Sequence, residues 1–439
     1  MLDDLKAAAR RIAVDRPLRQ VLADCARLLS VSGEANGPLL AQTIVERLER
    51  LSDEQRSRFF ERLASDFSPD PQAVLAAARA YADAPGADAL MRLTRVAEPP
   101  RQELFRRLNG APGGTAAIVR LRRGLLERLP KQPQLRVVEA DLLHLLSSWF
   151  NPGFLEMRKV DWNSPAQLLE QIIHHEAVHQ IDGWDDLRRR LQPDRRCFAF
   201  FHPQLPDEPL IFVEVALLPE MAGAIAPLID KRSVPLPPEQ FKVAVFYSIS
   251  NCQPGLRGVS LGNFLIKRVA EQLKRELPQL KTFCTLSPIP GLMAWLQRAD
   301  PAVLGEAAAA LTQLRAACGG DLGLLAHGGR LAALDGPTHH ALWRLAAHYL
   351  VHVSPQSQGD PVARFHLDNG ARLERLNAQA NLSARGLKES AGLMVNYLYD
   401  LAKIELHHDR FGQGRVAHSR AVSTLLSSPA LKQQTGDIA

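Results

Sequence analysis

The stretch "VAVFYSISNCQPGLRGVSLGNFLIKR" (residues 243–268) joins an apolar run, a glycine-bearing loop and the start of an amphipathic helix. The run Val243–Ser250 is short and rich in β-branched and aromatic residues, which is typical of a buried strand. The loop opens the helical pattern "LGNFLIKRVAEQLKREL". A helix N-terminus offers unpaired N–H groups and the positive end of a dipole, and glycines let a ligand approach the backbone closely. The stretch therefore predicts a strand–loop–helix unit suited to phosphate.

Two common phosphate loops are excluded by the residues themselves. No Gly-Lys-Ser/Thr follows, so this is not a Walker loop, and the glycine spacing is not that of the dinucleotide-binding fingerprint. An ordinary glycine-containing turn between strand and helix remains the alternative. The loop is similar to the acyl-CoA loop of the GNAT acyltransferase superfamily, [Q/R]-x-x-G-x-[G/A]. The matching residues are Arg257, Gly258, Val259, Ser260, Leu261 and Gly262, with Ser260 at the position of the pattern's middle glycine.

The neighbouring sequence predicts a sheet domain. "CFAFFHPQL" and "PLIFVEVALL" are short β-rich runs separated by "PDE", which indicates a hairpin. After the glycine loop and its helix come a strand, "KTFCTLSP", and a short helix, "IPGLMAWLQRA". This order predicts an α+β or α/β sheet. Residues 300–352 return to helical patterns, and "GLMVNYLYDL" near the C-terminus fits a strand or a helix equally.

The first part of the chain predicts helices only. In "LSDEQRSRFFERLASDF", Ser52 and Gln55 form a capping box, and the apolar side chains fall on one face. These apolar residues are Phe59, Phe60, Leu63 and Phe67. We expect residues 1–134 to form an all-helical packing or oligomerisation domain, with Pro130–Gln134 as the linker.

Composition limits the class of protein. With 439 residues, 46% hydrophobic and 23% charged, the chain predicts two or three globular domains. A net charge of +6 suits an anionic partner such as nucleic acid, a membrane surface or a phosphorylated cofactor. The basic residues are scattered and aromatics make up only 6%, so nucleic acid is disfavoured.

The cysteines and the N-terminus indicate the cellular compartment in which the protein is expected. Five cysteines without a CxxC pair predict free thiols in a reducing compartment: Cys25, Cys197, Cys252, Cys284 and Cys318. The start "MLDDLKAAARRIAVD" lacks the apolar segment of a signal peptide, and no stretch of 18 uncharged apolar residues predicts a membrane span. We therefore expect a cytoplasmic protein.

One segment raises a metal hypothesis. His175-Glu176-Ala177-Val178-His179 matches HExxH, which on a helix would place both imidazoles on one face to bind zinc, with Glu176 as general base. Asp182 stands where a metzincin carries glycine. The candidates for a third ligand are Glu208, Glu214 and Glu220. The alternative is a polar helix ending near Gly183, whose imidazoles make ordinary hydrogen bonds.

Four segments in series resemble the malonyl-CoA decarboxylase family. They are "EAVHQIDGWDDLRRRLQPDRRCFAFFHPQLPDEPLIFVEVAL", "FYSISNCQPGLRGVSLGNFLIKRV", "LSPIPGLMAWL", and "ARFHLDNGARLERLN" with "SARGLKESAGLMVNYLY". The resemblance implies a helical domain followed by a GNAT-like mixed-sheet catalytic domain, here residues 135–425, with a tail at 426–439. It implies conversion of malonyl-CoA to acetyl-CoA and CO2 in fatty-acid or malonate metabolism, without metal or organic cofactor.

The resemblance also implies site residues. Ser287 in "LSPIPG" matches the family's catalytic serine, His366 in "FHLDNG" its catalytic histidine, and Tyr399 a tyrosine near that site. Arg257–Gly262 matches the acyl-CoA loop, with Ser260 where some members carry glutamate. Taken alone, Ser287 reads as a turn serine, His366 as a hydrogen-bonded polar residue and Tyr399 as packing. The family segment binds no zinc, so His175 becomes incidental.

The chemistry explains why such residues are needed. Loss of CO2 from a β-carbonyl thioester leaves an enolate, whose oxygen must be stabilised and whose carbon needs a proton. We expect Ser287 and His366 to share a hydrogen bond, with Ser287 holding the carboxylate or relaying the proton and His366 as the acid. The alternatives are a GNAT-like acyltransferase, a zinc hydrolase and a non-catalytic acyl-CoA sensor. The expected partners are malonyl-CoA, acetyl-CoA and further copies of the chain, in a dimer or tetramer, with no nucleic acid or membrane.

Overall fold

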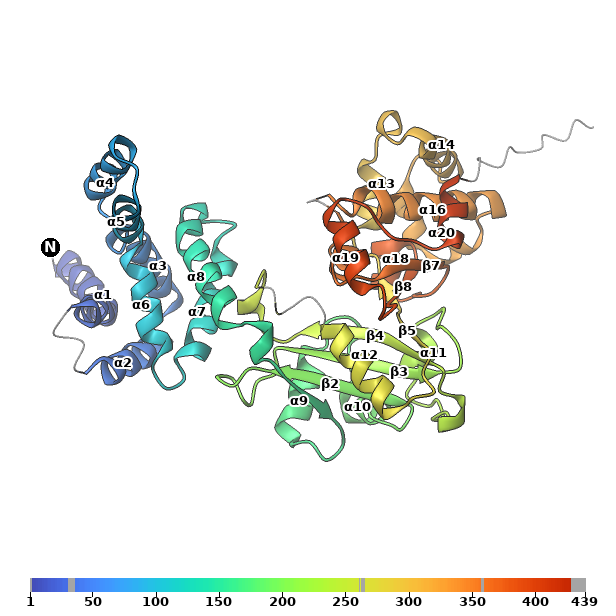
Figure 1. The fold of residues 1–439 in the computed structure, drawn as a ribbon, viewed down its shortest axis with the longest axis horizontal. Helices are drawn as coiled ribbons and strands as arrows, with labels where there is room; N and C mark the ends of the chain where they lie inside the picture. The colour runs from blue at the N-terminus through green and yellow to red at the C-terminus, as the bar shows by residue number, and fades with distance from the viewer. Residues whose placement is uncertain (1, 31–35, 260, 262–264, 357–358, 428–439) are drawn as a thin grey trace, which may run out of the picture. The chain divides into compact units, whose positions relative to one another are not determined.

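A computed structural model of the protein describes residues 2–30, 36–259, 261, 265–356 and 359–427, with side chains from Arg16 onward (Figure 1). The chain divides into two compact units. The helical unit comprises Met1–Glu156, Phe201–Leu210 and Gln253–Leu261. The sheet unit comprises Met157–Phe200, Ile211–Cys252 and Gly262–Ala439.

The helical unit is built from amphipathic helices, as the sequence predicts. They are α1 (Leu2–Leu29), α2 (Gly37–Arg50), α3 (Asp53–Asp66), α4 (Pro71–Asp83), α5 (Ala87–Ala97), α6 (Pro100–Asn109), α7 (Gly114–Arg128) and α8 (Arg136–Trp149). The capping box before α3 is confirmed: the Ser52 hydroxyl accepts from the Gln55 N–H at 3.2 Å, and the Gln55 side chain accepts from the Ser52 N–H at 2.9 Å. The predicted apolar face of α3 is buried, including Phe59 and Phe60.

The helical unit continues past residue 134, where the sequence analysis places its end. The expected linker Pro130–Gln134 begins in a turn and ends within a short 3-10 helix, Pro133–Leu135, which leads into α8. Helix α8 packs against α3, α6 and α7. Its buried side chains, including Val138, Leu142 and Leu146, complete the helical packing. Prolines next to a helix start do not by themselves mark a domain boundary.

The sheet unit contains a mixed sheet. Its strands among the described residues are β1 (Glu156–Val160), β2 (Arg195–Phe201), β3 (Ile211–Leu218), β4 (Val243–Asn251), β5 (Thr282–Thr285), β6 (Ser287–Pro288), β7 (Arg372–Asn377) and β8 (Met394–Leu398). They lie in the order β1-β2-β3-β4-β5-β8-β6, and β7 also pairs with β8. Strands β2, β3 and β4 are antiparallel neighbours, whereas β4 and β5 are parallel. The segment "GLMVNYLYDL", left open by the sequence, is therefore a strand.

The parallel pair β4 and β5 requires a crossover connection, and helix α12 (Leu265–Glu276) supplies it. This is the predicted order of strand, glycine loop, helix and strand. Helix α12 lies along one face of the sheet (Figure 1), where the Arg268 guanidinium sits 5.5 Å from the centre of the Phe200 ring. The side chains that α12 buries include Ile266, Val269 and Leu273.

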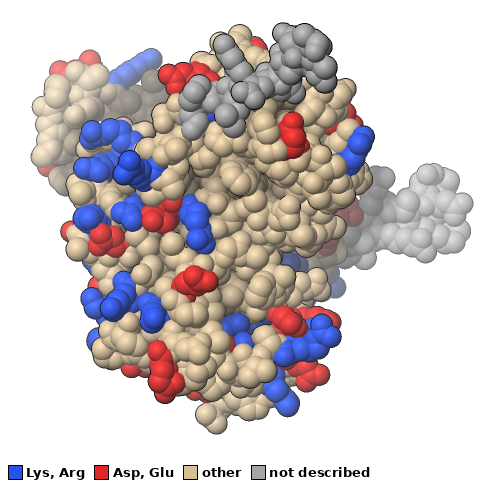
Figure 2. Space-filling model, turned by 90° about the vertical axis from the view of Figure 1, so that its right-hand side faces the viewer, with Lys and Arg blue, Asp and Glu red and all other residues tan. Residues whose placement is uncertain are grey.

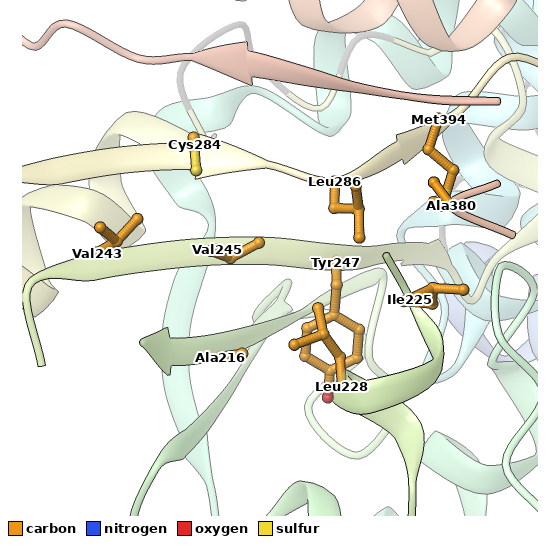
Figure 3. Packing of buried hydrophobic residues seen from close by; sticks show 10 residues of the cluster. All are labelled: Ala216, Ile225, Leu228, Val243, Val245, Tyr247, Cys284, Leu286, Ala380 and Met394. Carbon is orange, nitrogen blue, oxygen red and sulfur yellow. The ribbon is translucent and has the colours of Figure 1, made fainter. Parts of the chain in front are cut away.

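A buried apolar cluster packs against strands β3, β4 and β5 (Figure 3). Strand β4 contributes Val243, Val245 and Tyr247 to this cluster, and Tyr247 points toward Leu228 of the short helix α11 (Ala226–Ile229). Met394 of β8 belongs to the same cluster, so the last strand in the sequence is held by the packing of the middle strands. This packing holds the start of β8, where Val395 pairs with Ser287 of the site described below.

The sheet unit contains further helices. They are α9 (Ala166–His175), α10 (Gly183–Arg190), α13 (Leu292–Arg298), α14 (Ala308–Ala317), α15 (Gly328–Ala332), α16 (Gly336–His348), α17 (Pro361–Asp368), α18 (Ala384–Ser390), α19 (Ile404–Gly412) and α20 (Arg420–Ser427). Helix α16 packs against α14 and α20 and runs on into a π-helical turn, Tyr349–Val353. The fold class predicted from the sequence, a helical domain followed by an α+β mixed-sheet domain with helical insertions, is confirmed.

All five cysteines are free and buried, as predicted. No helix within the described ranges is long and apolar enough to cross a membrane. Lys and Arg side chains stand among Asp and Glu side chains on the face shown in Figure 2, in keeping with the scattered basic residues of the sequence.

Candidate active site

Strand β8 positions Ser287. The serine lies in the two-residue strand β6, where Ser287 pairs with Val395 of β8. Its Oγ lies 2.9 Å from Oγ1 of Thr285, which in turn accepts a hydrogen bond from the Tyr397 N–H at 3.1 Å. Ser287 is buried. Backbone pairing and the Thr285 hydroxyl together fix the position of the serine oxygen.

His366 lies in the last turn of α17, a helix whose length is fixed at both ends. Asp360 caps its start by accepting two backbone N–H groups at 3.0 Å, and Pro361 occupies the first helical position, where no N–H is needed. Beyond the helix, Gly370 has φ +77°, and a Cβ there would lie 2.3 Å from a backbone oxygen of α19. Only glycine fits at that position. The His366 side chain is consequently placed by local sequence and is 3% exposed.

Ser287, His366 and Tyr399 form one hydrogen-bonded chain. His366 Nε2 lies 2.9 Å from Ser287 Oγ, and His366 Nδ1 lies 2.8 Å from the Tyr399 hydroxyl. Tyr399 follows the end of β8, and its N–H donates to the Phe283 carbonyl of β5 at 2.8 Å. The Tyr397 ring stacks on the imidazole, with ring centres 4.7 Å apart. Three residues separated widely in the sequence therefore meet as the resemblance implied.

Burial determines the protonation of this chain. It lowers the pKa of His366 to about 3, so the imidazole is neutral at pH 7. It also raises the pKa of Tyr399, so the phenol keeps its proton. A neutral imidazole has one donor and one acceptor nitrogen. The hydrogen bonds from Ser287 through His366 to Tyr399 can therefore run in either of two donor-to-acceptor directions. A switch of the imidazole tautomer would pass a proton from one end of this series to the other.

Asp360 was not predicted by the sequence analysis, yet it connects both halves of the site. Besides capping α17, its Oδ2 accepts the Gly291 N–H at 2.9 Å. Gly291 ends the "SPIPG" segment that begins at Ser287. One buried carboxylate thus ties the loop of the serine to the helix of the histidine. Burial raises the pKa of Asp360. The Asp-Pro pair before "VARFHLDNG" signals the cap, whereas nothing in the sequence signals the contact with Gly291.

A cavity of about 290 Å³ opens beside the serine and the histidine. Ser287 and His366 are among its polar groups. Its apolar lining includes Val178, Ile211, Phe246, Ile249 and Phe365. A mostly apolar cavity with a few polar groups is suited to hold an acyl chain and to keep water from its reacting end.

The start of the glycine loop is anchored within the helical unit. The buried Arg122 guanidinium of α7 donates to the carbonyls of Gly255 at 2.6 Å and Arg257 at 2.8 Å, and pairs with Glu139 at 2.6 Å. A Cβ at Gly255 would lie 2.0 Å from the Val119 carbonyl oxygen, so glycine is needed there. Of the six loop residues proposed to bind CoA, Ser260 and Gly262 lie outside the described residues. Arg257 belongs to this anchor, and Gly258, Val259 and Leu261 follow it in the chain.

The helix expected for the HExxH segment is absent. Helix α9 ends at His175, so His175 and His179 do not share a helical face. The reason is Glu176: its carboxylate accepts the N–H groups of Val178 and His179 at 3.0 and 2.7 Å, and the hydroxyls of Ser248 and Ser250. These bonds turn the chain and occupy the carboxylate. Among the described residues no cluster of three His, Cys, Asp or Glu side chains suits a metal ion.

Comparison with known proteins gives consistent matches over both units. The family model of the malonyl-CoA decarboxylase C-terminal domain matches residues 153–436, and that of the N-terminal domain matches residues 67–150. The crystal structure of malonyl-CoA decarboxylase from Rhodopseudomonas palustris shares 45% identity at a TM-score of 0.82, covering 92% of this chain and 98% of that one. The enzyme from Agrobacterium vitis shares 44% at a TM-score of 0.81, covering 93% and 100%.

Curated relatives agree over a shorter span. The mitochondrial malonyl-CoA decarboxylase of Mus musculus is 38% identical over 338 residues, 71% of this chain and 67% of that protein. The Anser anser anser protein is 37% identical over 332 residues, 69% of this chain and 64% of that protein. The fold, the matched domains and these relatives define a class, the carboxy-lyases that act on CoA thioesters. Within that class, the chain belongs to the malonyl-CoA decarboxylase family.

Proposed function

We propose that this protein converts malonyl-CoA to acetyl-CoA and CO2, and that Ser287 and His366 carry the reaction. One observation supports this above the others: Ser287 Oγ and His366 Nε2 lie 2.9 Å apart beside an apolar cavity. Membership of the family supplies the substrate, because its described members are malonyl-CoA decarboxylases.

The reaction breaks the bond between the malonyl carboxylate carbon and C2. The electron pair moves onto C2 and the thioester oxygen as an enolate, CO2 leaves, and C2 then takes a proton to give acetyl-CoA. Hydrogen-bond donors in a water-poor cavity lower the barrier, because they stabilise the charge as it develops on the thioester oxygen. The apolar lining that includes Phe246 and Phe365 also favours loss of charge from the carboxylate.

His366 becomes an acid only when an anion is present. Burial lowers the pKa of its imidazole to about 3. A substrate carboxylate or enolate beside the ring favours the charged imidazolium and raises this pKa toward neutrality. His366 then donates a proton to C2 directly or through the Ser287 hydroxyl. Tyr399 is a positioning residue, because its hydroxyl fixes the tautomer and orientation of the ring through Nδ1.

The glycine loop is proposed to bind the CoA phosphates. The loop comprises Arg257 to Gly262, and its glycines let a phosphate approach the backbone N–H groups closely. The anchor from Arg122 to Gly255 and Arg257 holds the loop's first residues before CoA binds, which reduces the ordering cost of binding. No metal or organic cofactor has a role in this proposal. The predicted cytoplasmic location and the homo-oligomer stay predictions.

The test is an assay of purified protein with malonyl-CoA and EDTA, without any acyl acceptor. Equal amounts of CO2 and acetyl-CoA are expected. An acyltransferase would need an acceptor, a zinc hydrolase would lose activity in EDTA, and an acyl-CoA sensor would bind the thioester without turnover. Any of these three results would contradict the proposal.

A further inference from the structure

A second cavity, of about 420 Å³, lies in the sheet unit beside α16. Three side chains from one face of α16 and its π-helical turn line it: Arg344, His348 and His352. The two imidazole centres lie 4.9 Å apart, which confirms that they share this face. Solvent exposure increases along these three residues: Arg344 is buried, His348 is half-buried and His352 is exposed.

Arg344 has no adequate counter-charge among the described residues. It is 5% exposed, and its ion-pair partner is Glu306 at 3.9 Å, a side chain that is itself 87% exposed. Within the described ranges, none of the Arg344, His348 and His352 side chains makes a hydrogen bond. A guanidinium removed from bulk water without a close anion is costly, unless a ligand supplies the charge. Its donors face a cavity large enough for one.

The same geometry excludes a metal ion. Two histidines four residues apart resemble a metal pair, but the Arg344 charge lies beside them and repels a cation. Burial lowers the pKa of His348 to about 4 and also lowers that of His352, so both rings are neutral at pH 7 and each can donate one hydrogen bond. A cation and two neutral donors around one cavity match the oxygens of an anion. The rest of the lining consists of the Glu306 carboxylate, Ser427 and an apolar wall that accepts a short carbon chain. The apolar residues are Leu304, Ala307 and Leu426.

We propose that Arg344, His348 and His352 form a binding site for a small oxyanion, a phosphate or a short carboxylate, separate from Ser287 and His366. The oxyanion pairs with the Arg344 guanidinium and accepts hydrogen bonds from the two imidazoles. This site goes beyond the decarboxylase function and does not depend on it.

Equilibrium dialysis of the full-length protein tests the site, with inorganic phosphate in one arm and malonate in the other, at constant ionic strength in chloride. Saturable binding of at least one anion is expected, and the arm that binds identifies the ligand's chemistry. Arg344→Met keeps the side-chain length without the charge and should weaken binding about tenfold or more. The matched control is Arg232→Met, which removes a 93% exposed guanidinium and should bind as wild type.

Two further measurements keep the test decisive if Arg344→Met does not fold. His352→Ala changes an exposed residue and should weaken binding by roughly threefold or more. The Trp295 ring stacks on His348 with ring centres 6.1 Å apart, so anion titration should change the tryptophan fluorescence, and Trp295→Phe should abolish that change. Absence of saturable binding in both arms, or wild-type binding by the Arg344 and His352 variants, would overturn the proposal.

Discussion

The Tyr399 hydroxyl lies 2.8 Å from Nδ1 of His366, on the side of the imidazole opposite to Ser287. Both ring nitrogens of His366 therefore have a hydrogen-bond partner within the protein, and neither depends on a solvent molecule for one. This arrangement explains how a buried, neutral imidazole keeps one orientation before substrate binds.

Tyr399→Phe should lower kcat by about tenfold to a hundredfold, because Nδ1 loses the partner that fixes the tautomer. Tyr397→Phe is the matched control. Tyr397 stacks on the same imidazole, but its buried hydroxyl has no hydrogen-bond partner among the described residues. Removing that hydroxyl should leave kcat and the melting temperature close to wild type. Steady-state kinetics of both variants check this, and equal losses in the two would argue against a role for the Tyr399 hydroxyl.

Asp360→Ala should destabilise the protein by about 2 to 4 kcal/mol, because it removes a helix cap and leaves the Gly291 N–H without its partner. It should also lower kcat, since the serine loop and the histidine helix lose their shared carboxylate. Asp70→Ala removes the cap of α4, which has the same Asp-Pro start but is exposed. Asp70→Ala should lower the free energy of unfolding by about 1 kcal/mol and leave kcat unchanged. Thermal denaturation and kinetics separate the two outcomes; full activity in folded Asp360→Ala would be inconsistent with the bridging role.

Arg122→Met should raise the KM for malonyl-CoA several-fold with a smaller change in kcat, because the first residues of the glycine loop lose their anchor. It should also lower stability by about 3 to 5 kcal/mol, since Glu139 loses its partner. Arg120→Met is the control: Arg120 lies on the same helix and pairs with Glu49, with both side chains half exposed. An unchanged KM in folded Arg122→Met would show that this anchor does not contribute to CoA binding.

The stability of the protein should fall as pH is lowered from 6.5. The ordinary pKa of histidine is 6.5, and burial lowers that of His366 to about 3 in the folded protein. Between these values the unfolded chain binds the extra proton, so the stability that neutral His366 contributes is complete above pH 6.5 and is lost as the pH falls. Each such group contributes a slope of about 1.4 kcal/mol per pH unit.

His366→Gln should reduce this slope by about that amount, whereas the exposed His174→Gln should not. Urea denaturation between pH 5 and pH 7.5 measures the slopes. His179, whose pKa is also lowered to about 3 by burial, adds a contribution of its own to all of these proteins. An identical pH dependence in wild type and His366→Gln would show that the imidazole is not held neutral in the folded state.

Much of the fold followed from local patterns. A short apolar run rich in β-branched and aromatic residues predicted β4, which is buried on both faces. The 3.6-residue periodicity predicted α12 and the helices of the helical unit, because these helices bury one face each. The sequence did not decide between a strand and a helix at Met394–Leu398, because a short apolar run suits either when it is buried. Pairing with β5, β6 and β7 makes this segment a strand. The wrong helix at Glu176 has the same origin. The carboxylate's partners, Ser248 and Ser250, lie more than 70 residues away in the sequence.

The candidate site likewise combines residues that were predicted from the sequence with residues that were not. Ser287, His366 and Tyr399 were singled out by resemblance, whereas their composition and spacing alone favour ordinary structural roles. Thr285 and Asp360 were not predicted, because their contacts form only when β6, β8 and α17 come together. The anchor at Arg122 was missed for the same reason: it joins α7 to a loop that follows it by more than 130 residues.

The most direct test of the central claim is the rate of CO2 release from malonyl-CoA by wild type, Ser287→Ala, His366→Ala and the double variant, with EDTA present and no acceptor. If the two residues act as one unit, each single substitution should lower the rate by roughly a hundredfold or more, and the double variant should lose little beyond the larger single loss. A wild-type rate in either folded single variant, or losses that multiply in the double variant, would contradict the proposed Ser287–His366 pair.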